Sequence, residues 1–336
     1  MKAVVVKNQG FEIGEKEKPE LKGKGAIVKI NGCGLCGSDL VKLKHGTFKD
    51  GDVPGHEIVG TIVSVNTDAD FMPGDRIVAG HHVPCYECVF CYGQNHSMCR
   101  KFKNTNIVPG GFAEYVYLSE DHLLNTTFKV PGGVSDEHIS FTEPFACCLR
   151  AVKRMKINYG SNVLIIGLGS IGILMGQAAK TAGYRVFGID LISDRVLNAK
   201  KYGFDDTYLL QNTDETVTDM KLENCPNGFD AIIMTSGADA ALELALKAVR
   251  DGGLINVFSS VKLDETSYSN NEIYYRELSV IGSYSSSPAE LEESFDLLVR
   301  GAVKTEGLYS VYKFDEINSA ISDEKDKKIY KAYLKP

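Results

Sequence analysis

Two patterns of hydrophobic and polar positions divide the chain near residue 150. Up to that point, short apolar runs are separated by glycine and proline, and Pro73 with Gly74 marks one of the turns. Short apolar runs bounded by turn residues are typical of β-strands, so we predict a mainly β region over residues 1–148. Its predicted strands are residues 2–6, 25–30, 58–65, 76–79 and 112–118.

After residue 150, apolar runs alternate with helical stretches. The clearest helix follows the first of these runs, because Ile171, Leu174, Met175 and Ala178 recur at three- and four-residue steps along one face. Alternating strands and helices indicate a parallel, doubly wound sheet. The predicted strands are residues 163–166, 186–189, 231–234, 254–258 and 278–281.

The C-terminal part carries one more helical pattern, over residues 289–299, followed by two short strand-like runs. Because the parallel sheet already has its strands, we assign this part to the first domain. The sequence therefore predicts an α/β protein with two domains. The mainly β domain comprises residues 1–148 and 285–336, and the doubly wound domain comprises residues 149–284.

Composition supports two cores and limits the partners. The 336 residues are 43% hydrophobic, which is enough for two domains of ordinary size. Charged residues make up 24% and the formal net charge is -7, so no general basic field attracts nucleic acid or an anionic membrane. The sequence shows neither a secretory signal nor an apolar segment long enough to span a bilayer. We expect a cytoplasmic protein whose partners are small molecules.

The most specific motif of the first domain is C-x-x-C-x-x-C-x7-C, formed by Cys85, Cys88, Cys91 and Cys99. Thiolates at such short intervals can converge on one tetrahedral ion, and a site with four sulfur ligands is closed and structural. The alternatives are two disulfides or an iron–sulfur cluster. Neighbouring C-x-x-C pairs would make strained rings, and the total of nine cysteines is odd. We therefore expect reduced thiols and a structural zinc in a lobe over residues 80–105, with the cluster as the main alternative.

A glycine-rich turn, Gly167-x-Gly169-x-x-Gly172, joins the first strand of the second domain to its helix. Gly167 permits the tight turn, Gly169 lets a pyrophosphate approach the backbone, and Gly172 allows the helix to pack closely on the strand. The phosphates would meet the helix N-terminus at Ser170 and Ile171, where backbone N–H groups are free. The alternative is an ordinary turn between a strand and a helix.

Asp190 ends the second strand of this domain, 18 residues after Gly172. A carboxylate at this position can accept both hydroxyls of an adenosine ribose. It favours NAD over NADP, because a 2′-phosphate would face a like charge. Arg195, five positions further on, could instead flank the ribose or bind a phosphate, or lie in solvent on a helix.

A dehydrogenase with this cofactor needs a group that stabilises the alkoxide from which hydride leaves, and a partly open metal can do so as a Lewis acid. The candidates are Cys36, in the segment G-L-C-G-S-D, and His56 with Glu57, in the segment G-H-E. Together with the cysteine quartet, the glycine turn, Asp190 and their order, these segments resemble the zinc-dependent medium-chain alcohol dehydrogenases, in particular the sorbitol and polyol dehydrogenase branch. The resemblance covers nearly the whole chain.

The resemblance implies a GroES-like catalytic domain interrupted by an NAD-binding Rossmann domain, with the active site in the cleft between them. It implies two zinc ions per chain and a homodimer or homotetramer. The catalytic zinc would be held by Cys36, His56 and a third ligand, which falls on Glu143 where many relatives have cysteine. In the polyol branch the position of Glu57 can also bind zinc or exchange with water, so both carboxylates are candidates.

The proton relay departs from the family pattern. Ser38 lies two residues after Cys36, where the resemblance places a hydroxyl that can accept the alcohol proton. Val41 stands where many relatives have a histidine, and a valine cannot pass a proton. Nothing in the sequence shows that His45 replaces it.

Other reactive side chains have no assigned role. Cys147 and Cys148 compete with Glu143 for the third ligand position, but they fall at the start of an apolar helix and we expect them in the core. The histidines without an assigned role are His81, His82, His96, His122 and His138.

The sequence therefore predicts an NAD-dependent zinc dehydrogenase that interconverts a secondary alcohol, a polyol or sugar derivative, with its ketone. Zinc would bind the alcohol oxygen, Ser38 or water would take its proton, and hydride would pass to the nicotinamide ring. The alternatives are a threonine-type or sugar-phosphate dehydrogenase of the same family, or a non-enzymatic cofactor-binding protein built on the same fold.

Overall fold

The computed structural model describes residues 1–237, 239–259 and 270–336. The chain separates into two compact units. The first comprises Met1–Ala146 and Ser286–Pro336, and the second comprises Cys147–Ser285. The chain leaves the first unit within helix α6 (Thr142–Met155) and returns to it shortly before helix α12 (Pro288–Val299).

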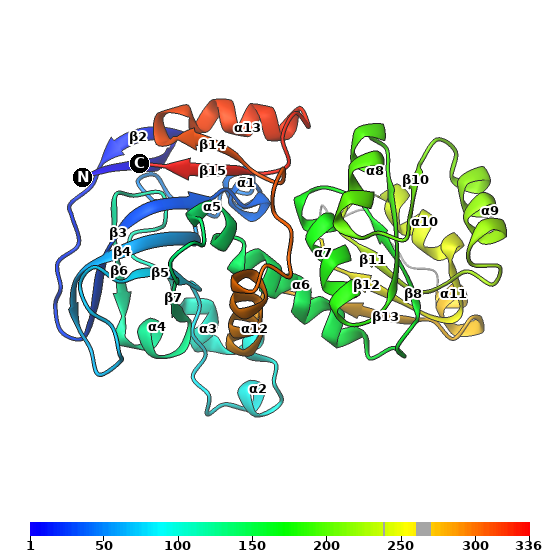
Figure 1. The fold of residues 1–336 in the computed structure, drawn as a ribbon, viewed down its shortest axis with the longest axis horizontal. Helices are drawn as coiled ribbons and strands as arrows, with labels where there is room; N and C mark the ends of the chain where they lie inside the picture. The colour runs from blue at the N-terminus through cyan, green and yellow to red at the C-terminus, as the bar shows by residue number, and fades with distance from the viewer. Residues whose placement is uncertain (238, 260–269) are drawn as a thin grey trace. The chain divides into compact units, whose positions relative to one another are not determined.

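Strand β3 (Gly25–Gly34) is the most extensively paired strand of a seven-stranded sheet in the first unit. It pairs antiparallel with β4 (Glu57–Asn66), β6 (Tyr115–Ser119) and β15 (Ala332–Lys335). The C-terminal strands thus lie beside strands from the N-terminal part of the chain (Figure 1). The other strands of this unit are β1 (Lys2–Lys7), β2 (Gly10–Glu15), β5 (Arg76–Ala79), β7 (Thr127–Lys129) and β14 (Ser310–Lys313).

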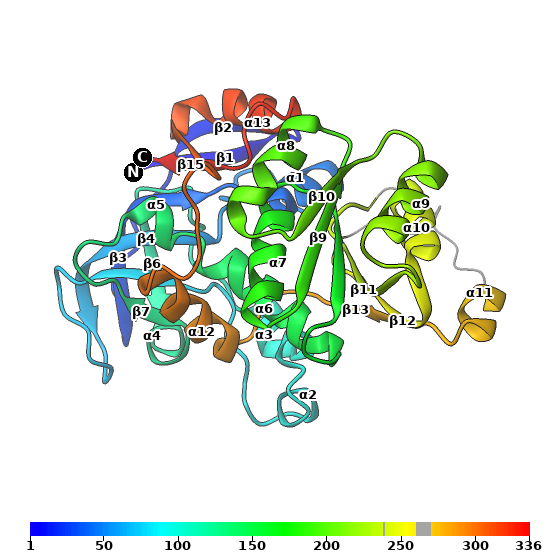
Figure 2. The same cartoon turned by 45° about the vertical axis from the view of Figure 1, so that its right-hand side comes forward.

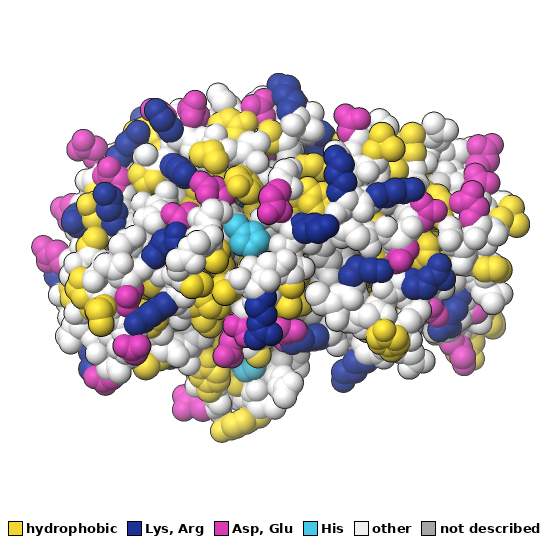
Figure 3. Space-filling view, in the orientation of Figure 1, with side chains coloured by type: hydrophobic (Ala, Val, Ile, Leu, Met, Phe, Trp, Pro, Cys, Tyr) yellow, Lys and Arg dark blue, Asp and Glu magenta, His cyan; other side chains and the backbone are white. Residues whose placement is uncertain are grey.

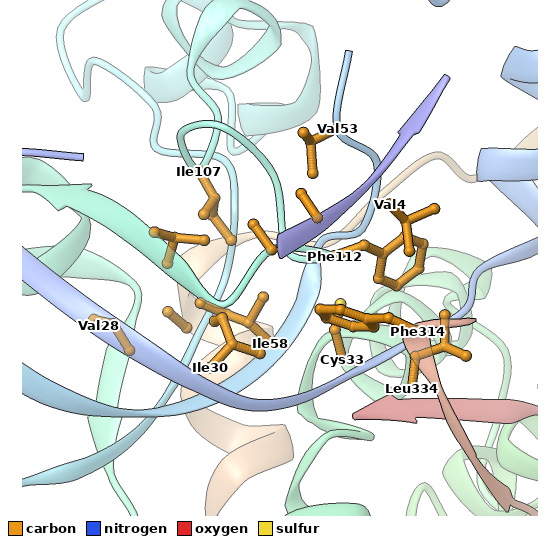
Figure 4. Close-up of a cluster of buried hydrophobic side chains, with 14 of the residues drawn as sticks. Val4, Val28, Ile30, Cys33, Val53, Ile58, Ile107, Phe112, Phe314 and Leu334 are labelled. Carbon is orange, nitrogen blue, oxygen red and sulfur yellow. The ribbon is translucent and has the colours of Figure 1, made fainter. Parts of the chain in front are cut away.

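The core of the first unit draws side chains from both ends of the sequence. Figure 4 shows Val4 and Phe112 close to Phe314 and Leu334, and all four are buried. Full burial of an aliphatic or aromatic side chain stabilises the fold by about 1.5–3 kcal/mol. The C-terminal segment therefore contributes directly to the stability of this unit.

Short helices connect the strands of the first unit. Helix α1 directly follows β3 and carries several of the predicted site residues. The helices are α1 (Gly37–Lys44), α2 (Val89–Tyr92), α3 (Arg100–Asn104), α4 (Glu120–Asn125), α5 (Asp136–Ile139), α12 and α13 (Ile317–Lys325), with 3-10 turns at His96–Met98 and Phe314–Glu316.

Two differences from the predicted strands have local causes. The strand expected at residues 112–118 begins only at Tyr115, because the N–H of Phe112 donates to the carbonyl of Pro54 at 2.9 Å and its own carbonyl accepts from Val4 at 2.8 Å. Strand β2 was not predicted, because its sequence G-F-E-I-G-E holds too few apolar residues to stand out. It forms an antiparallel pair with β1.

The second unit contains a six-stranded parallel sheet with the order β10-β9-β8-β11-β12-β13. The predicted doubly wound fold is confirmed. Its strands are β8 (Asn162–Ile166), β9 (Arg185–Asp190), β10 (Asp206–Leu209), β11 (Phe229–Met234), β12 (Val249–Val257) and β13 (Ser279–Gly282).

Connections in this sheet run outward from β8 in both directions, so the helices cover both faces (Figures 1 and 2). Loops at the carboxyl ends of β8 and β11 therefore meet where the direction of winding reverses, which is the usual place for a ligand in this fold. The helices are α7 (Ser170–Thr181), α8 (Ser193–Ala199), α9 (Thr213–Glu223), α10 (Asp239–Ala248) and α11 (Asn270–Tyr275), with a 3-10 turn at Lys200–Tyr202.

Candidate functional site

Three side chains of the first unit bring metal-ligating atoms together. Cys36 precedes the first turn of α1, His56 lies just before β4, and Glu57 is the first residue of that strand. Their ligand atoms, one from each residue, all lie within 4.8 Å of one another. His56 and Glu57 are buried, whereas Cys36 is partly accessible. One thiol, one imidazole and one carboxylate thus converge on a common point.

Asp39 fixes the orientation of His56 from helix α1. Its Oδ1 lies 3.4 Å from Nδ1 of His56, and its Oδ2 accepts the backbone N–H of Cys36 at 3.3 Å. Burial opposes a charge on the ring, but Asp39 and Cys36 outweigh this effect and raise the pKa of His56 well above its usual value. The same negative groups would stabilise a bound dication.

Lys331 holds the Glu57 carboxylate inside the protein. Its Nζ lies 2.9 Å from Oε1 and 2.7 Å from Oε2 of Glu57, and it donates to the carbonyl of Leu35 at 2.8 Å. Burial alone would lower the pKa of Lys331, but Glu57 and Cys36 raise it, so the ammonium stays charged. A Cβ on Gly34 would collide with Oε2 of Glu57, so this position has room only for glycine.

The three-residue group fits a zinc ion. Oε2 of Glu57 is buried and paired with Nζ of Lys331 at 2.7 Å, without a hydrogen bond of regular geometry. An ionised carboxylate oxygen paired in this way keeps lone pairs that a metal ion could accept. Sulfur, imidazole nitrogen and carboxylate oxygen are the donor atoms of zinc sites, and a site with three protein ligands keeps a position open for substrate.

Glu143 does not belong to the group of three but is linked to it through a histidine. It is buried in the first turn of α6, and its Oε1 lies 3.9 Å from Nδ1 of His81. The ring of His81 packs against that of His56, with 4.6 Å between the ring centroids. Cys148 lies on the same helix and is buried, as expected for a core residue, and Cys147 beside it is half-buried.

The sequence analysis assigned no role to three residues of this site: Asp39, Lys331 and His81. Burial, reinforced by the neighbouring rings of His82 and His56, lowers the pKa of His81 well below its usual value, so the ring is neutral at pH 7. Two adjacent histidines in a turn have no spacing typical of metal ligands. The only sequence signal was their place between a predicted strand and the cysteine motif. His82 and His122 hydrogen bond to backbone carbonyls.

Ser38, the predicted proton acceptor, is exposed on α1. Its hydroxyl donates to Sγ of Cys36 at 3.2 Å. Val41 is 42% exposed on the same helix, so the position where many relatives have a histidine presents an apolar side chain to solvent. Ser38 therefore places a hydroxyl, whose proton can exchange with water, beside the sulfur of Cys36.

The four cysteines of the predicted lobe converge as a second metal-ligating group. The Sγ of Cys85 lies 3.9 Å from that of Cys91 and 3.6 Å from that of Cys99, and the sulfurs of Cys88 and Cys91 are 3.6 Å apart. A tetrahedron with sulfur about 2.3 Å from a central Zn²⁺ has edges of about 3.8 Å. Thiolates that ligate different irons of a cluster lie further apart, and no disulfide joins these cysteines. The group fits a single ion.

Backbone donors around the lobe favour thiolates. Burial opposes ionisation of Cys99, but the N–H groups of Phe102 and Cys85 outweigh it and lower the pKa of its thiol to about 6. The N–H of Cys85 lies 3.4 Å from this sulfur. Metal ligation requires the thiolate form, which the backbone favours at Cys99, whereas burial raises the pKa of the Cys91 thiol to about 12.

The glycine-rich turn in the second unit has the geometry of a dinucleotide-binding turn. Gly167 has a φ of +93°, and a Cβ on Gly172 would collide with the carbonyl of Gly167. Gly169 precedes α7, and the first turn of this helix, with Ser170 and Ile171, has no side-chain cap. The backbone therefore leaves N–H groups where a pyrophosphate could accept them.

Thr235, at the end of β11, supports the turn and was not identified from the sequence. Its hydroxyl lies 2.9 Å from the carbonyls of both Ile166 and Gly167. A single threonine after an apolar strand gives no distinguishing signal. Its role depends on the pairing of β11 with β8, which the tertiary structure determines.

Asp190 is engaged with the backbone on both of its oxygens. Oδ2 accepts the N–H of Leu168 at 2.6 Å, and Oδ1 accepts the N–H of Ile192 at 2.9 Å. Arg195 lies 4.0 Å from Oδ2 of Asp190 and near Gly169. The Asp190 carboxylate thus holds the glycine turn, and the Arg195 guanidinium lies beside both. Carboxylate oxygens have lone pairs left for ribose hydroxyls.

Figure 3 shows one face of the molecule, on which Lys and Arg side chains are interspersed with Asp and Glu. This mixture agrees with the net charge of -7 and gives that face no basic field. Among the described helices, none combines the length and the apolar character needed to cross a bilayer.

Comparison with known proteins gives two domain matches. The alcohol dehydrogenase GroES-like domain matches residues 22–130, and the zinc-binding dehydrogenase domain matches residues 170–300. An erythritol/L-threitol dehydrogenase from Mycolicibacterium smegmatis is 31% identical over 313 residues, 84% of this chain and 83% of the relative. A sorbitol dehydrogenase from Halalkalibacterium halodurans is 29% identical, over 96% of each chain.

A solved structure is similar over the whole chain. It is described as a zinc-binding dehydrogenase from Sinorhizobium meliloti 1021, bound to NADP, and it is 27% identical. The similarity has a TM-score of 0.87 and covers 100% of this chain and 99% of the other. The similarity to this structure therefore spans both units of the chain.

Proposed function

Because this chain belongs to the zinc-binding, GroES-like alcohol dehydrogenase family, we propose that it oxidises a secondary alcohol, a polyol or sugar derivative, to the ketone and passes the hydride to NAD. The observation that carries the proposal is the group of Cys36, His56 and Glu57 in a chain that also has a dinucleotide-type glycine turn. The sorbitol and erythritol/L-threitol dehydrogenases among its relatives support a polyol substrate.

In this oxidation, the C–H bond at the alcohol carbon breaks and its electron pair leaves as hydride, which converts NAD to NADH. The O–H bond loses its proton, and the C=O bond forms. When bound, zinc would supply Lewis acidity that lowers the pKa of the alcohol oxygen, and NAD would supply a nicotinamide ring that takes up hydride. The protein would hold both groups, orient them and remove the proton.

Cys36, His56 and Glu143 would hold the catalytic ion, with Glu57 as an exchangeable donor. The ion pair between Lys331 and Glu57 supports this division, because a carboxylate neutralised by a buried ammonium has less charge to offer a cation. Asp39 keeps the His56 ring in a fixed orientation. The second ion would lie among the four cysteines of the lobe and stabilise it.

Ser38 would remove the alcohol proton. Its hydroxyl is exposed and lies 3.2 Å from the sulfur of Cys36, so it can accept a proton near the ligand group and release it to water or to a ribose hydroxyl. NAD rather than NADP is supported by Asp190, whose charge would repel a 2′-phosphate. Arg195 limits this repulsion from 4.0 Å away.

The location and assembly of the enzyme are part of the proposal. All nine cysteines are free of disulfides in the structure, which supports a reducing compartment such as the cytoplasm. A homodimer or homotetramer is proposed from the family resemblance alone.

The test combines metal analysis with kinetics on the purified wild-type protein. We expect two zinc ions per chain and NADH formation with sorbitol, erythritol or related polyols, with little activity on a primary alcohol. A protein with one zinc per chain that forms no NADH on any polyol would contradict the proposal.

The roles of the two glutamates can be separated by substitution. Glu143→Ala should lower zinc occupancy of the catalytic site, or turnover, more than Glu57→Ala does. The opposite order, measured by metal content and kinetics together, would make Glu57 the permanent ligand. Both variants should keep the zinc of the cysteine lobe, which serves as an internal control.

A further inference from the structure

His81 occupies a fixed position beside the catalytic metal group. It follows β5, and its backbone carbonyl accepts a hydrogen bond from Nε2 of His122 at 3.1 Å. The residue is 8% exposed. Its backbone is held by His122, and its buried ring cannot reach solvent without a local rearrangement, so its neighbours define its role.

The ring of His81 contacts two of the residues proposed as ligands of one ion. Its centroid lies 4.6 Å from that of His56, and its Nδ1 lies 3.9 Å from Oε1 of Glu143. His56 comes from the segment before β4 and Glu143 from α6, which are far apart in the sequence. His81 thus links these two parts of the site.

We propose that His81 is a positioning residue, whose ring N–H directs one carboxylate oxygen of Glu143 so that the other oxygen faces the metal. The inference rests on the proposed function. A neutral imidazole has one N–H donor, and an ionised carboxylate accepts at both oxygens. Groups that hold a metal ligand in place in this way set metal affinity as strongly as many direct ligands do.

The distance of 3.9 Å between Nδ1 and Oε1 is longer than the 2.7–3.2 Å typical of an N–H···O hydrogen bond. A shift of about 1 Å in either side chain closes the difference. Hydrogen bonds of catalytic groups are often long without their ligands and shorten when the site is filled. The contact with His56 holds the imidazole in place while Glu143 adjusts.

His82 provides a matched control on the same turn. Its ring packs against that of His81, with 3.8 Å between the ring centroids and 42° between the ring planes, and it also packs against Phe102. Its Nδ1 lies 2.7 Å from the carbonyl of Thr105, so its environment is comparable and its hydrogen bond goes to the backbone rather than to Glu143. Replacing it tests the effect of losing one imidazole from the stack.

The experiment measures zinc affinity of the catalytic site by chelator competition in the full-length protein, for the wild type and for His81→Phe, His81→Asn and His82→Phe. His81→Phe keeps the ring but loses the donor, and we expect affinity to fall about 10- to 100-fold. His81→Asn, whose amide can replace the Nδ1 donor, should restore most of it. His82→Phe should leave it within a factor of about three.

A double-substitution cycle with Glu143→Ala decides whether His81 acts through Glu143. In the Glu143→Ala background, His81→Phe should cause no further loss of affinity, and the visible spectrum of the cobalt-substituted catalytic site should be the same with either residue at position 81. Additive losses, or equal losses in His81→Phe and His82→Phe, would overturn the inference.

Failure of the inference is distinguishable from failure of the proposed function. If the wild-type protein binds no zinc outside the cysteine lobe, the proposed function fails. If it binds two zinc ions and His81→Phe binds them with unchanged affinity, only the role of His81 is wrong. Zinc retained in the cysteine lobe of each variant shows that the protein has folded.

Discussion

At the scale of single residues, the position of Glu57 depends on close contacts with two other residues. Glu57 reaches the metal group only because Gly34 has no Cβ, and its charge is tolerated only because Lys331 neutralises it. Removing one partner of a buried ion pair costs about 3–5 kcal/mol, because the remaining charge is left uncompensated. Lys331, near the C-terminus, therefore belongs to the proposed active site as much as Cys36 does.

Substitution of Ser38 tests the proton path. With Val41 at the usual histidine position, the alcohol proton must leave through Ser38 or through water, so Ser38→Ala should slow alcohol oxidation about 100-fold near neutral pH. High pH should partly restore the rate, because hydroxide replaces the missing acceptor. The check is the pH–rate profile of kcat for alcohol oxidation. An unchanged profile in Ser38→Ala would show that water reaches the reacting oxygen directly.

Cofactor preference is a second prediction at this scale. Wild-type protein should prefer NAD to NADP, and Asp190→Ala should reduce the ratio of the two kcat/KM values by removing the repulsion of the 2′-phosphate. Arg195→Gln should raise the ratio, since it removes the nearby positive charge. The ratio is the informative quantity, because loss of the hydrogen bonds between Asp190 and the turn weakens the binding of both cofactors. A wild-type preference for NADP would show that attraction of the 2′-phosphate by Arg195 outweighs its repulsion by Asp190.

At the scale of elements, two short segments gather most of the chemistry. Helix α1 and the residue before it supply Cys36, Ser38 and Asp39, so one turn carries the proposed ligand, the proposed proton acceptor and the partner of His56. The cysteine lobe contains only four-residue α2, a 3-10 turn and five-residue α3. Helices this short are unstable alone, so we expect the lobe to depend on the proposed ion.

Loss of the structural ion should unfold the lobe. Cys99→Ser removes one of four thiolates, and since structural zinc contributes roughly 10 kcal/mol or more of binding free energy, we expect loss of one zinc per chain and a lower temperature of unfolding. Cys225→Ser is the matched control, because Cys225 is equally buried but lies in the core of the second unit. Cys36→Ser should instead fold normally and show no turnover.

Metal analysis and thermal unfolding of these three variants provide the measurement. Retention of both zinc ions in Cys99→Ser would rule out the four-cysteine site. Loss of zinc in Cys225→Ser would show that zinc content reports general instability rather than ligation.

At the scale of the whole molecule, the proposed metal sites and the proposed NAD site belong to units with separate hydrophobic cores. The core of the first unit surrounds β3 and β4, and that of the second surrounds β8 and β11. The metal groups belong to the first unit and the glycine turn to the second. Each core can therefore be stabilised by its own ligand.

Ligand addition and removal should affect the two units differently. NAD at 100 times its dissociation constant should stabilise the unit that binds it by about 2.7 kcal/mol, whereas a chelator should destabilise the first unit. Calorimetry should show two transitions, of which NAD raises one and the chelator lowers the other. A single transition that responds to both would mean that the units unfold together.

The sequence by itself predicted the architecture and indicated the candidate ligands. Strand and helix periodicity gave the parallel sheet, because buried parallel strands form continuous apolar runs such as that of β8. Closely spaced cysteines and glycines indicated the lobe and the turn, because their geometry is local: a few residues of backbone suffice to bring the atoms together. The lobe's sulfurs, 3.6 to 3.9 Å apart, illustrate this directly.

Only the tertiary structure decided the partners of those residues. Lys331 is 274 residues from Glu57 in sequence, and Thr235 is 68 residues from Gly167, so no local pattern could connect them. His81 has a role only because β5 delivers it next to His56 and Glu143. Local spacing fixes which atoms can ligate an ion, whereas chain packing fixes which charges and donors surround them. The sequence therefore determines which side chains can form the proposed site, and the fold determines which charges and hydrogen-bond donors surround them.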